Sequence, residues 1–209
     1  MRPKLLLATN NKAKVSEYKS LLQNLPFELV TLAEEGISTV VDEAGESMEE
    51  NARLKATVLA AESQLLALAD DSGLEVDALG GEPSTLSHRY AGEGASDEDR
   101  IHFLLSRLSD VPWESRSACF RCVIAVATPV GEVGFCSGKC CGIITFEPRG
   151  DQGFGYDPVF YLTEFDKTMA ELPLEVKNQV SHRGKAAREV SRVIAGLMGE
   201  EKSDTGALA

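Results

Sequence analysis

The sequence predicts an α/β protein with a mixed central sheet that extends into a second lobe. Strand-like and helical stretches alternate over about the first hundred residues, and strand-like stretches then cluster between 118 and 162. No internal repeat or linker divides the chain. We therefore expect residues 1–199 to form one domain, followed by a polar, flexible tail at 200–209.

The first half of the chain alternates between strands and helices. The expected strands are residues 4–9, 27–31, 65–69 and 74–79. The first helix follows Asn10 and Asn11, the second starts with a capping box at Ser47 and runs to about Gln64, and the third is capped by Ser96. The second helix is expected to turn these residues inward: Leu54, Val58 and Ala61.

The second half is richer in strands. They are expected at 118–128, 132–137, 142–146 and 159–162, with a glycine-rich loop at 148–158. A short helix should span 172–180. A single last helix should begin after Ser181 and end at Gly199.

The composition limits the partners. There are 33 acidic and 21 basic residues among 209, for a net charge of -12. Proteins that bind nucleic acid along its phosphates usually have the opposite balance. No apolar run approaches the ~20 residues of a membrane helix, and the run at 5–8 is too short for a signal peptide. We expect a cytoplasmic protein with no nucleic-acid or membrane partner, although a metal or a few cations could still bind a small anion.

The five cysteines are expected to be free thiols, because their number is odd and no secretion signal is present. Cys119-x-x-Cys122 resembles half of a zinc site. It falls within an expected strand, however, where residues three apart face opposite sides. Buried or half-buried thiols are the preferred interpretation.

The first candidate site is the turn from Thr9 to Lys14. A helix that begins directly after a strand presents N–H groups and a partial positive charge to an anion. Thr9 and Asn10 add side-chain donors, and Lys12 and Lys14 add charge. The alternative is an ordinary turn with solvated lysines.

The second candidate site contains Asp70 and Asp71, which follow an apolar strand. Sheets in α/β proteins place their ligands at such strand ends. In an extended chain the two side chains face opposite sides, so only one can enter a given cleft. Mg²⁺ binds one or two carboxylates together with substrate phosphates. The alternative is a capped turn.

Acids that precede the second helix are candidates for a further metal ligand. Glu50 has a stronger structural role as the acid of the capping box, and Glu49 is a solvated acid in the first turn that the helix dipole favours. Glu43 is therefore the preferred ligand, with Asp42 as an alternative. Lys55 lies further along this helix and has a solvated surface lysine as its alternative.

Two further segments suggest a ligand. Glycines beside aromatic rings at 153–157 permit close backbone approach and stacking on a base, unless the loop only packs Phe154 inward. His182 and Arg183 lie in the first turn of the last helix, where their charge opposes the helix dipole. That placement indicates a nearby anion or a donor function, with Lys177 close in sequence. The alternative is a surface position without a role.

Together these segments resemble the inosine/xanthosine triphosphate pyrophosphatase family, the dITP/XTP pyrophosphatases. The matching stretches, in the family's order, are residues 8–14, 50–56, 69–74, 87–92, 153–158 and 181–184. Each is weak alone, but the ordered set is specific. The resemblance implies an elongated fold with its active site in a cleft between two lobes, and a homodimer.

The resemblance also implies a reaction: Mg²⁺-dependent cleavage of a purine nucleoside triphosphate to the monophosphate and pyrophosphate, which cleanses the nucleotide pool. Asp71 looks like the catalytic acid that binds metal and accepts the proton of the attacking water, and Glu43 looks like its metal partner. The phosphate turn would be Thr9, Asn10, Asn11, Lys12, Ala13 and Lys14, with Lys55 and Ser72 also on the substrate. The base and ribose site would be Phe154, Gly155, Tyr156, Asp157, Lys177, His182 and Arg183.

The chemistry of these residues agrees with a 6-keto purine. O6 of ITP, dITP or XTP can accept a hydrogen bond from arginine or histidine. A 6-amino purine such as ATP would leave that donor unpaired, at ~1–3 kcal/mol for each buried group. Two alternatives remain at this point: a phosphatase that forms a phospho-aspartate at Asp70 or Asp71, and a nucleotide-binding sensor without turnover.

Overall fold

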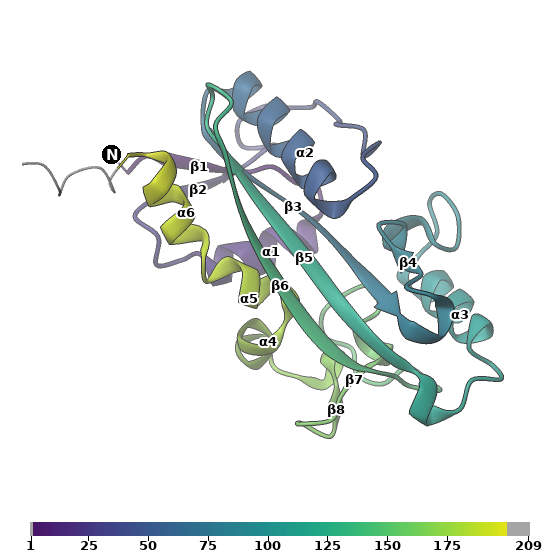
Figure 1. Ribbon diagram of the computed structural model, residues 1–209. Helices are drawn as coiled ribbons and strands as arrows, with labels where there is room; N and C mark the ends of the chain where they lie inside the picture. The colour runs from purple at the N-terminus through teal and green to yellow at the C-terminus, as the bar shows by residue number, and fades with distance from the viewer. Residues whose placement is uncertain (1, 200–209) are drawn as a thin grey trace, which may run out of the picture.

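The structure, a computed structural model, describes residues 2–199 and contains one eight-stranded sheet with helices on both faces (Figure 1). The strand order is β2-β1-β3-β5-β6-β7-β8, with β4 paired to β3. The strands are β1 (Lys4–Leu7), β2 (Glu28–Thr31), β3 (Leu66–Val76), β4 (Pro83–Ser84), β5 (Ser117–Ala127), β6 (Val133–Ile144), β7 (Phe160–Leu162) and β8 (Lys167–Thr168). The α-helices are α1 (Lys12–Leu21), α2 (Met48–Ser63), α3 (Asp97–Arg107), α4 (Leu174–Val180), α5 (His182–Ala187) and α6 (Val190–Leu197). The predicted tail at 200–209 lies outside the described residues.

The first lobe is built on the parallel strands β2, β1 and β3. Side chains alternate between the two faces of β1. Leu6 and Ala8 pack with α2, whereas Leu5 and Leu7 pack with α1, α5 and α6. Both faces of β1 are therefore covered, which explains its continuous apolar sequence.

The second lobe is an antiparallel continuation of the same sheet. β3, β5 and β6 are long strands that run from one lobe into the other (Figure 1). Leu74, Phe120 and Ile144 on these strands pack against α3 and the segments around β7. This elongated, mixed sheet flanked by helices confirms the predicted fold class.

Two predicted strand breaks are wrong. β3 continues through residues 70–73, because their backbone pairs with residues 121–124 of β5. β6 likewise spans residues 138–141, which pair with 119–122. Pairing with a neighbouring strand outweighs the preference of aspartate, serine and glycine for turns.

The buried face of α2 is not the predicted one. Leu54 and Val58 are 40% and 38% exposed, and Ala61 is also exposed. The buried apolar residues nearest the sheet are Ala52, Ala56, Leu59 and Ala60. The three alanines let α2 pack closely on the alanines of β3 and β5. Close packing against the sheet therefore decides which face of α2 is buried, and the larger side chains Leu54 and Val58 remain outside.

The predicted last helix is two helices. The N–H of Glu189 donates to the carbonyl of Ala186 at 3.2 Å, which closes a turn between α5 and α6. The change in direction brings Val190 and Ile194 into the same apolar cluster as α5. The sequence contains no glycine or proline at this point to indicate the turn.

The cysteines partly contradict the prediction. Cys122, Cys136 and Cys140 are free and buried, as expected, but Cys119 and Cys141 form a disulfide. These two residues lie directly opposite each other on β5 and β6. Their side chains therefore meet on one face of the sheet, a register that sequence spacing does not reveal.

The disulfide should contribute to stability. Its partners are 22 residues apart, and closing a loop of that length stabilises the folded state by about 3 kcal/mol. Dithiothreitol should lower the free energy of unfolding by about this amount in urea denaturation. Cys141→Ser should show the same loss without reductant and no further change with it. Identical curves for the wild type with and without reductant would contradict this expectation.

Candidate active site

The candidate site opens where the edge of β3 lies free. β1 pairs with β3 only as far as Leu68, and β4 pairs with it from Leu74 onward. Between these positions no strand of residues 2–199 covers that edge of β3, and a cavity of about 720 Å³ adjoins it. This volume is within the range of small-ligand pockets. The ammonium of Lys55 bonds the carbonyl of Asp70 here at 2.6 Å.

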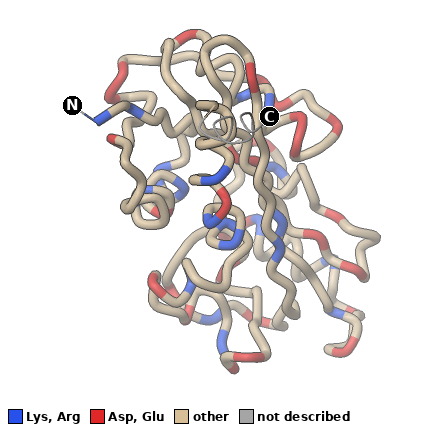
Figure 2. The backbone as a smooth tube through the Cα atoms, turned by 60° about the vertical axis from the view of Figure 1, so that its left-hand side comes forward, with Lys and Arg blue, Asp and Glu red and all other residues tan. Residues whose placement is uncertain are grey.

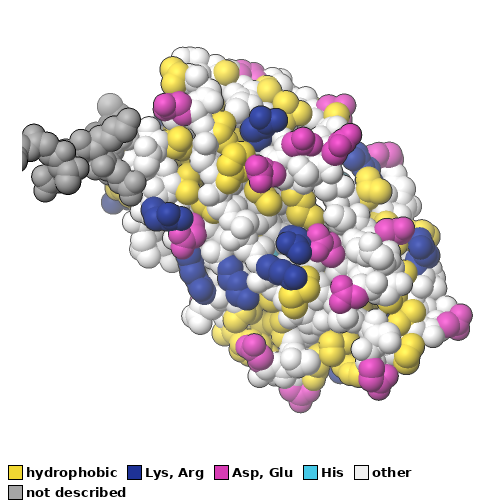
Figure 3. Space-filling model, viewed as in Figure 1, with side chains coloured by type: hydrophobic (Ala, Val, Ile, Leu, Met, Phe, Trp, Pro, Cys, Tyr) yellow, Lys and Arg dark blue, Asp and Glu magenta, His cyan; other side chains and the backbone are white. Residues whose placement is uncertain are grey.

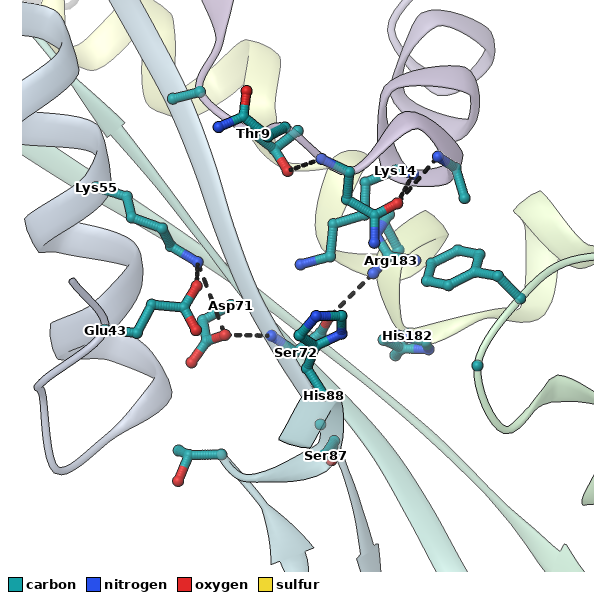
Figure 4. Close-up of a pocket in the computed structure, with 18 of the residues that line it drawn as sticks. Thr9, Lys14, Glu43, Lys55, Asp71, Ser72, Ser87, His88, His182 and Arg183 are labelled. Carbon is teal, nitrogen blue, oxygen red and sulfur yellow. Dashed lines mark hydrogen bonds and ion pairs between the residues drawn. The ribbon is translucent and has the colours of Figure 1, made fainter. Parts of the chain in front are cut away.

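The predicted site residues converge on this cavity, with one exception. Figure 4 shows Glu43, Lys55 and Asp71 on one side of it and His182 and Arg183 on the other. Lys12 is exposed on the first turn of α1 and is not among the residues that line the cavity. The predicted residues that line it are Thr9, Asn10, Asn11, Ala13, Lys14, Glu43, Lys55, Asp71, Ser72, Phe154, Gly155, Tyr156, Asp157, Lys177, His182 and Arg183.

Asp71 is held in a fixed orientation. Asn51, which is 2% exposed, donates to its Oδ2 at 3.1 Å, and the N–H of Ser72 donates to its Oδ1 at 3.1 Å. Burial raises the pKa of Asp71 above its ordinary value, and nearby Glu43 adds to the rise, although Lys55 opposes it. A carboxylate with a raised pKa is better suited to accept a proton near neutral pH.

The surroundings of Asp71 fit a magnesium ion. The Lys55 ammonium lies 2.7 Å from Glu43 Oε1 and 3.8 Å from Asp71 Oδ1, so two carboxylates approach one positive charge. Mg²⁺ uses such a pair together with substrate phosphates. The alternative ligands Asp42 and Glu50 are exposed and do not line the cavity. Glu43 and Asp71 are thus the donor set that suits the metal.

Asp70 faces the opposite side of β3 and has a structural role. Its carboxylate pairs with Lys14 at 3.0 Å and with Arg183 at 3.3 Å. Burial alone would raise the pKa of Asp70, but Lys14, Arg183 and Lys55 hold it well below its usual range. Asp70 therefore fixes the cation of the phosphate turn and that of α5.

A second buried acid, Glu17, completes this network. It pairs with Lys177 and Arg183, each at 2.7 Å, and all three side chains are almost fully buried. Arg183 thus has its compensating anions, Glu17 and Asp70, within the protein. The charge that opposes the dipole of α5 is neutralised by these carboxylates, so the nearby anion expected from the sequence is supplied by the protein itself. Figure 2 shows Lys and Arg concentrated near the middle of the molecule and many acidic residues around its periphery.

Histidine and aromatic rings line the other end of the cavity. His182 stacks on Phe120, with ring centroids 4.6 Å apart. Burial, with Arg183 and Lys177 nearby, lowers the pKa of His182 well below its ordinary value, so the ring is neutral at physiological pH. Its Nδ1 is buried, and within the described chain no protein group bonds it. A neutral imidazole can donate from one nitrogen and accept at the other.

Glycines allow these groups to come together. At Gly138 of β6, an added Cβ would lie 2.1 Å from the carbonyl oxygen of His182, so only glycine lets α5 approach. Gly153 has φ +78°, and its Cβ would lie 2.1 Å from Asp157 Oδ2. Asp157 in turn accepts from the N–H of Phe154 at 2.9 Å and pairs with Lys177. The loop is thus folded tightly around a buried ion pair.

Comparison with known proteins identifies the family of this chain. The model of the Ham1 family matches residues 5–193. The chain belongs to the Ham1 family. A dITP/XTP pyrophosphatase of Geobacter sulfurreducens is 52% identical over 183 residues, covering 88% of this chain and 92% of the relative. A dITP/XTP pyrophosphatase of Bacillus subtilis is 43% identical, covering 90% of this chain and 96% of the relative. A solved HAM1 protein from Coxiella burnetii superposes with a TM-score of 0.83 at 39% identity, covering 93% of this chain and 99% of that one.

Sequence reasoning missed several residues that line this cavity or support its lining. Glu17 carried a weak signal, since it is an acid beside Tyr18 on the apolar face of α1. Asn51 falls in the matching stretch 50–56 but had no assigned role. Phe120, Asp97 and Arg100 line the cavity from β5 and α3, and no motif marks them. They are brought to the site only by the tertiary fold.

Asp70 should be important for stability. Replacing it by asparagine leaves Lys14 and Arg183 without their common carboxylate, and breaking a buried ion pair in this way costs about 3–5 kcal/mol. Asp70→Asn should lose this much unfolding free energy at pH 7 in urea denaturation. Because the folded-state pKa of Asp70 is lowered, the deficit should narrow as the pH falls below about 4, the ordinary aspartate pKa.

The control for this variant is Asp110→Asn, which changes an exposed aspartate after α3. It should remain within about 0.5 kcal/mol of the wild type, as surface substitutions generally do. Equal stability of the Asp70 and Asp110 variants at pH 7 would show that Asp70 does not hold the network.

Proposed function

We propose that this protein hydrolyses the 6-keto purine nucleoside triphosphates ITP, dITP and XTP to the monophosphate and pyrophosphate, with Mg²⁺ as cofactor. The reaction would clear these nucleotides from the cellular pool. The names of the relatives support this activity. The observation that carries it is Asp71, an oriented carboxylate with a raised pKa in the same cavity as the phosphate turn.

Asp71 has the properties of the general base. As the oxygen of water attacks the α-phosphorus, the bond from phosphorus to the leaving pyrophosphate breaks and the water proton passes to Asp71. Asn51 holds one carboxylate oxygen in place during this transfer. Mg²⁺ held by Glu43 and Asp71 would neutralise phosphate charge and make the water more acidic. Lys14 and the N-terminus of α1 supply further positive charge.

The other end of the cavity suits a purine ring. Phe154 provides an aromatic face, and the Lys177 and Arg183 cations lie 5.1 and 5.4 Å from its centroid. The unpaired Nδ1 of His182 is a polar group that a ligand could satisfy. A 6-keto purine offers these groups an acceptor at O6 and a donor at N1–H, whereas adenine offers the reverse pattern, a donor at its 6-amino group and an acceptor at N1.

We also propose a homodimer that acts in the cytoplasm. The family resemblance supports the dimer, and so do hydrophobic side chains exposed among charged ones on the face of the molecule seen in Figure 3. Phe135 of β6 and Leu54 and Val58 of α2 are among the exposed apolar residues. No helix among the described residues is long and apolar enough to span a membrane.

A product assay over a substrate panel tests the function. With Mg²⁺, ITP, dITP and XTP should release pyrophosphate, and chelation of the metal should abolish the release. For ATP, kcat/KM should be lower by about 5–150-fold for each buried donor left unpaired. Orthophosphate as the first product would indicate a phospho-aspartate mechanism instead, and binding without turnover would indicate a sensor.

The role of Asp71 can be tested separately. Asp71→Asn keeps a similar shape but removes the base and one metal ligand, so kcat for ITP should fall at least about 100-fold. The matched control is Glu75→Gln, which lies on the same face of β3 but pairs with Arg121. It should keep kcat within about threefold of wild type. Turnover of Asp71→Asn within about tenfold of wild type would contradict the assignment.

A further inference from the structure

The first turn of α3 reaches the loop assigned to the base. Asp97, the first residue of this helix, accepts a hydrogen bond from the N–H of Gly155 at 2.7 Å. Its other carboxylate oxygen pairs with Arg100. Both Asp97 and Arg100 line the cavity. A carboxylate from a separate helix thus holds the backbone between Phe154 and Tyr156.

Arg100 extends this contact to a second wall of the cavity. Arg100 is 7% exposed, and its Nη1 donates to the carbonyls of Ala95 at 2.6 Å and His88 at 2.9 Å. His88 belongs to the short helix η2 (Ser87–Arg89), which follows β4. The Tyr156 hydroxyl bonds the Ser87 carbonyl at 2.9 Å. The η2 segment and the loop at 153–157 are therefore fixed to one another through Asp97, Arg100 and Tyr156.

The loop needs such an external anchor. Gly153 and Gly155 have positive φ values of +78° and +62°. Glycine adopts such values as readily as negative ones, so these two residues permit the conformation of the loop but do not fix it. Asp157 holds the inner side of the loop through the Phe154 N–H. Asp97, which lies outside the loop on α3, accepts a hydrogen bond from the N–H of Gly155. Asp97 is thus a second carboxylate that holds the backbone beside Phe154, in addition to Asp157 and to the Tyr156 hydroxyl at the end of the loop.

Stability alone does not account for Asp97. An aspartate in the first helical turn is favoured by the helix dipole, but that role leaves its oxygens free to face solvent. Asp97 instead directs both oxygens toward Gly155 and Arg100 while its side chain stays 44% exposed. Its removal should therefore disturb the loop more than the core.

We propose that Asp97 and Arg100 are positioning residues that set the shape of the base-binding end of the cavity and thereby sharpen the selection of the purine base. The proposal rests on the function proposed above. Discrimination between bases requires donors and rings held to within a fraction of an ångström. The pair supplies that rigidity from outside the loop that contacts the base.

The test compares Asp97→Ala with Asp97→Asn, for which KM and kcat are measured by pyrophosphate release from ITP and GTP. Asp97→Ala should raise KM for ITP about tenfold, the effect of losing one charge-assisted hydrogen bond, with kcat within about threefold. Its preference for ITP over GTP should fall about fivefold or more. Asp97→Asn keeps an acceptor for the Gly155 N–H but loses the ion pair, so it should recover part of both losses.

A matched pair provides the control. Glu189 and Arg192 at the start of α6 form the same acid–arginine contact three residues apart, at 3.0 Å, and line no part of the cavity. Glu189→Ala should match the wild type in KM and base preference. Equal KM and preference in Asp97→Ala and wild type would overturn the inference, as would a proportional loss for both nucleotides that Asp97→Asn does not recover. Absence of pyrophosphate from the wild type would instead refute the proposed function.

Discussion

The free edge of β3 between Leu68 and Leu74 is the constraint on which the site depends. β3 belongs to both lobes, as β5 and β6 do, so one continuous sheet connects the two lobes beneath the cleft. β1 ends where the phosphate turn begins, and β4 pairs with β3 only in the second lobe. Backbone groups at such an edge need partners, and Lys55 provides one by bonding the Asp70 carbonyl. The ammonium of the same lysine also lies close to the carboxylates of Glu43 and Asp71. The side chain that bonds the free backbone carbonyl therefore also holds the two carboxylates proposed for the reaction.

Charge balance explains how an acidic protein can bind a triphosphate. The net charge of -12 describes the whole surface, whereas the cavity contains cations that the fold has buried and paired. Glu17 and Asp70 form ion pairs with Lys14, Lys177 and Arg183 inside the protein, where isolated charges would be very costly. Removing one partner of such a pair is costly, because the other charge is left buried and unpaired, and the intact pairs also fix the directions in which the cationic groups point.

The sequence predicted which residues lie at the cavity better than the elements that carry them. Short motifs pointed to Asp71, Lys14 and His182, which all line the cavity. The strand breaks were predicted wrongly, since the pairing of β3 with β5 is a long-range interaction that overrides local preference. The buried face of α2, the Cys119–Cys141 disulfide and the approach of Asp97 to Gly155 also depend on tertiary packing. No local sequence pattern indicates any of these three features.

Asp70 and Asp71 show how one strand separates structure from chemistry. They are adjacent and identical in type, yet alternation along β3 turns them to opposite faces. Burial acts on both carboxylates, but Asp70 meets Lys14 and Arg183 and its pKa falls, whereas Asp71 lies beside Glu43 and its pKa rises. A carboxylate that stays ionised can anchor cations, and one that is more basic can accept a proton. The sequence predicted opposite faces for these two side chains in an extended backbone, with a capped turn as the alternative; the continuous strand β3 enforces the separation.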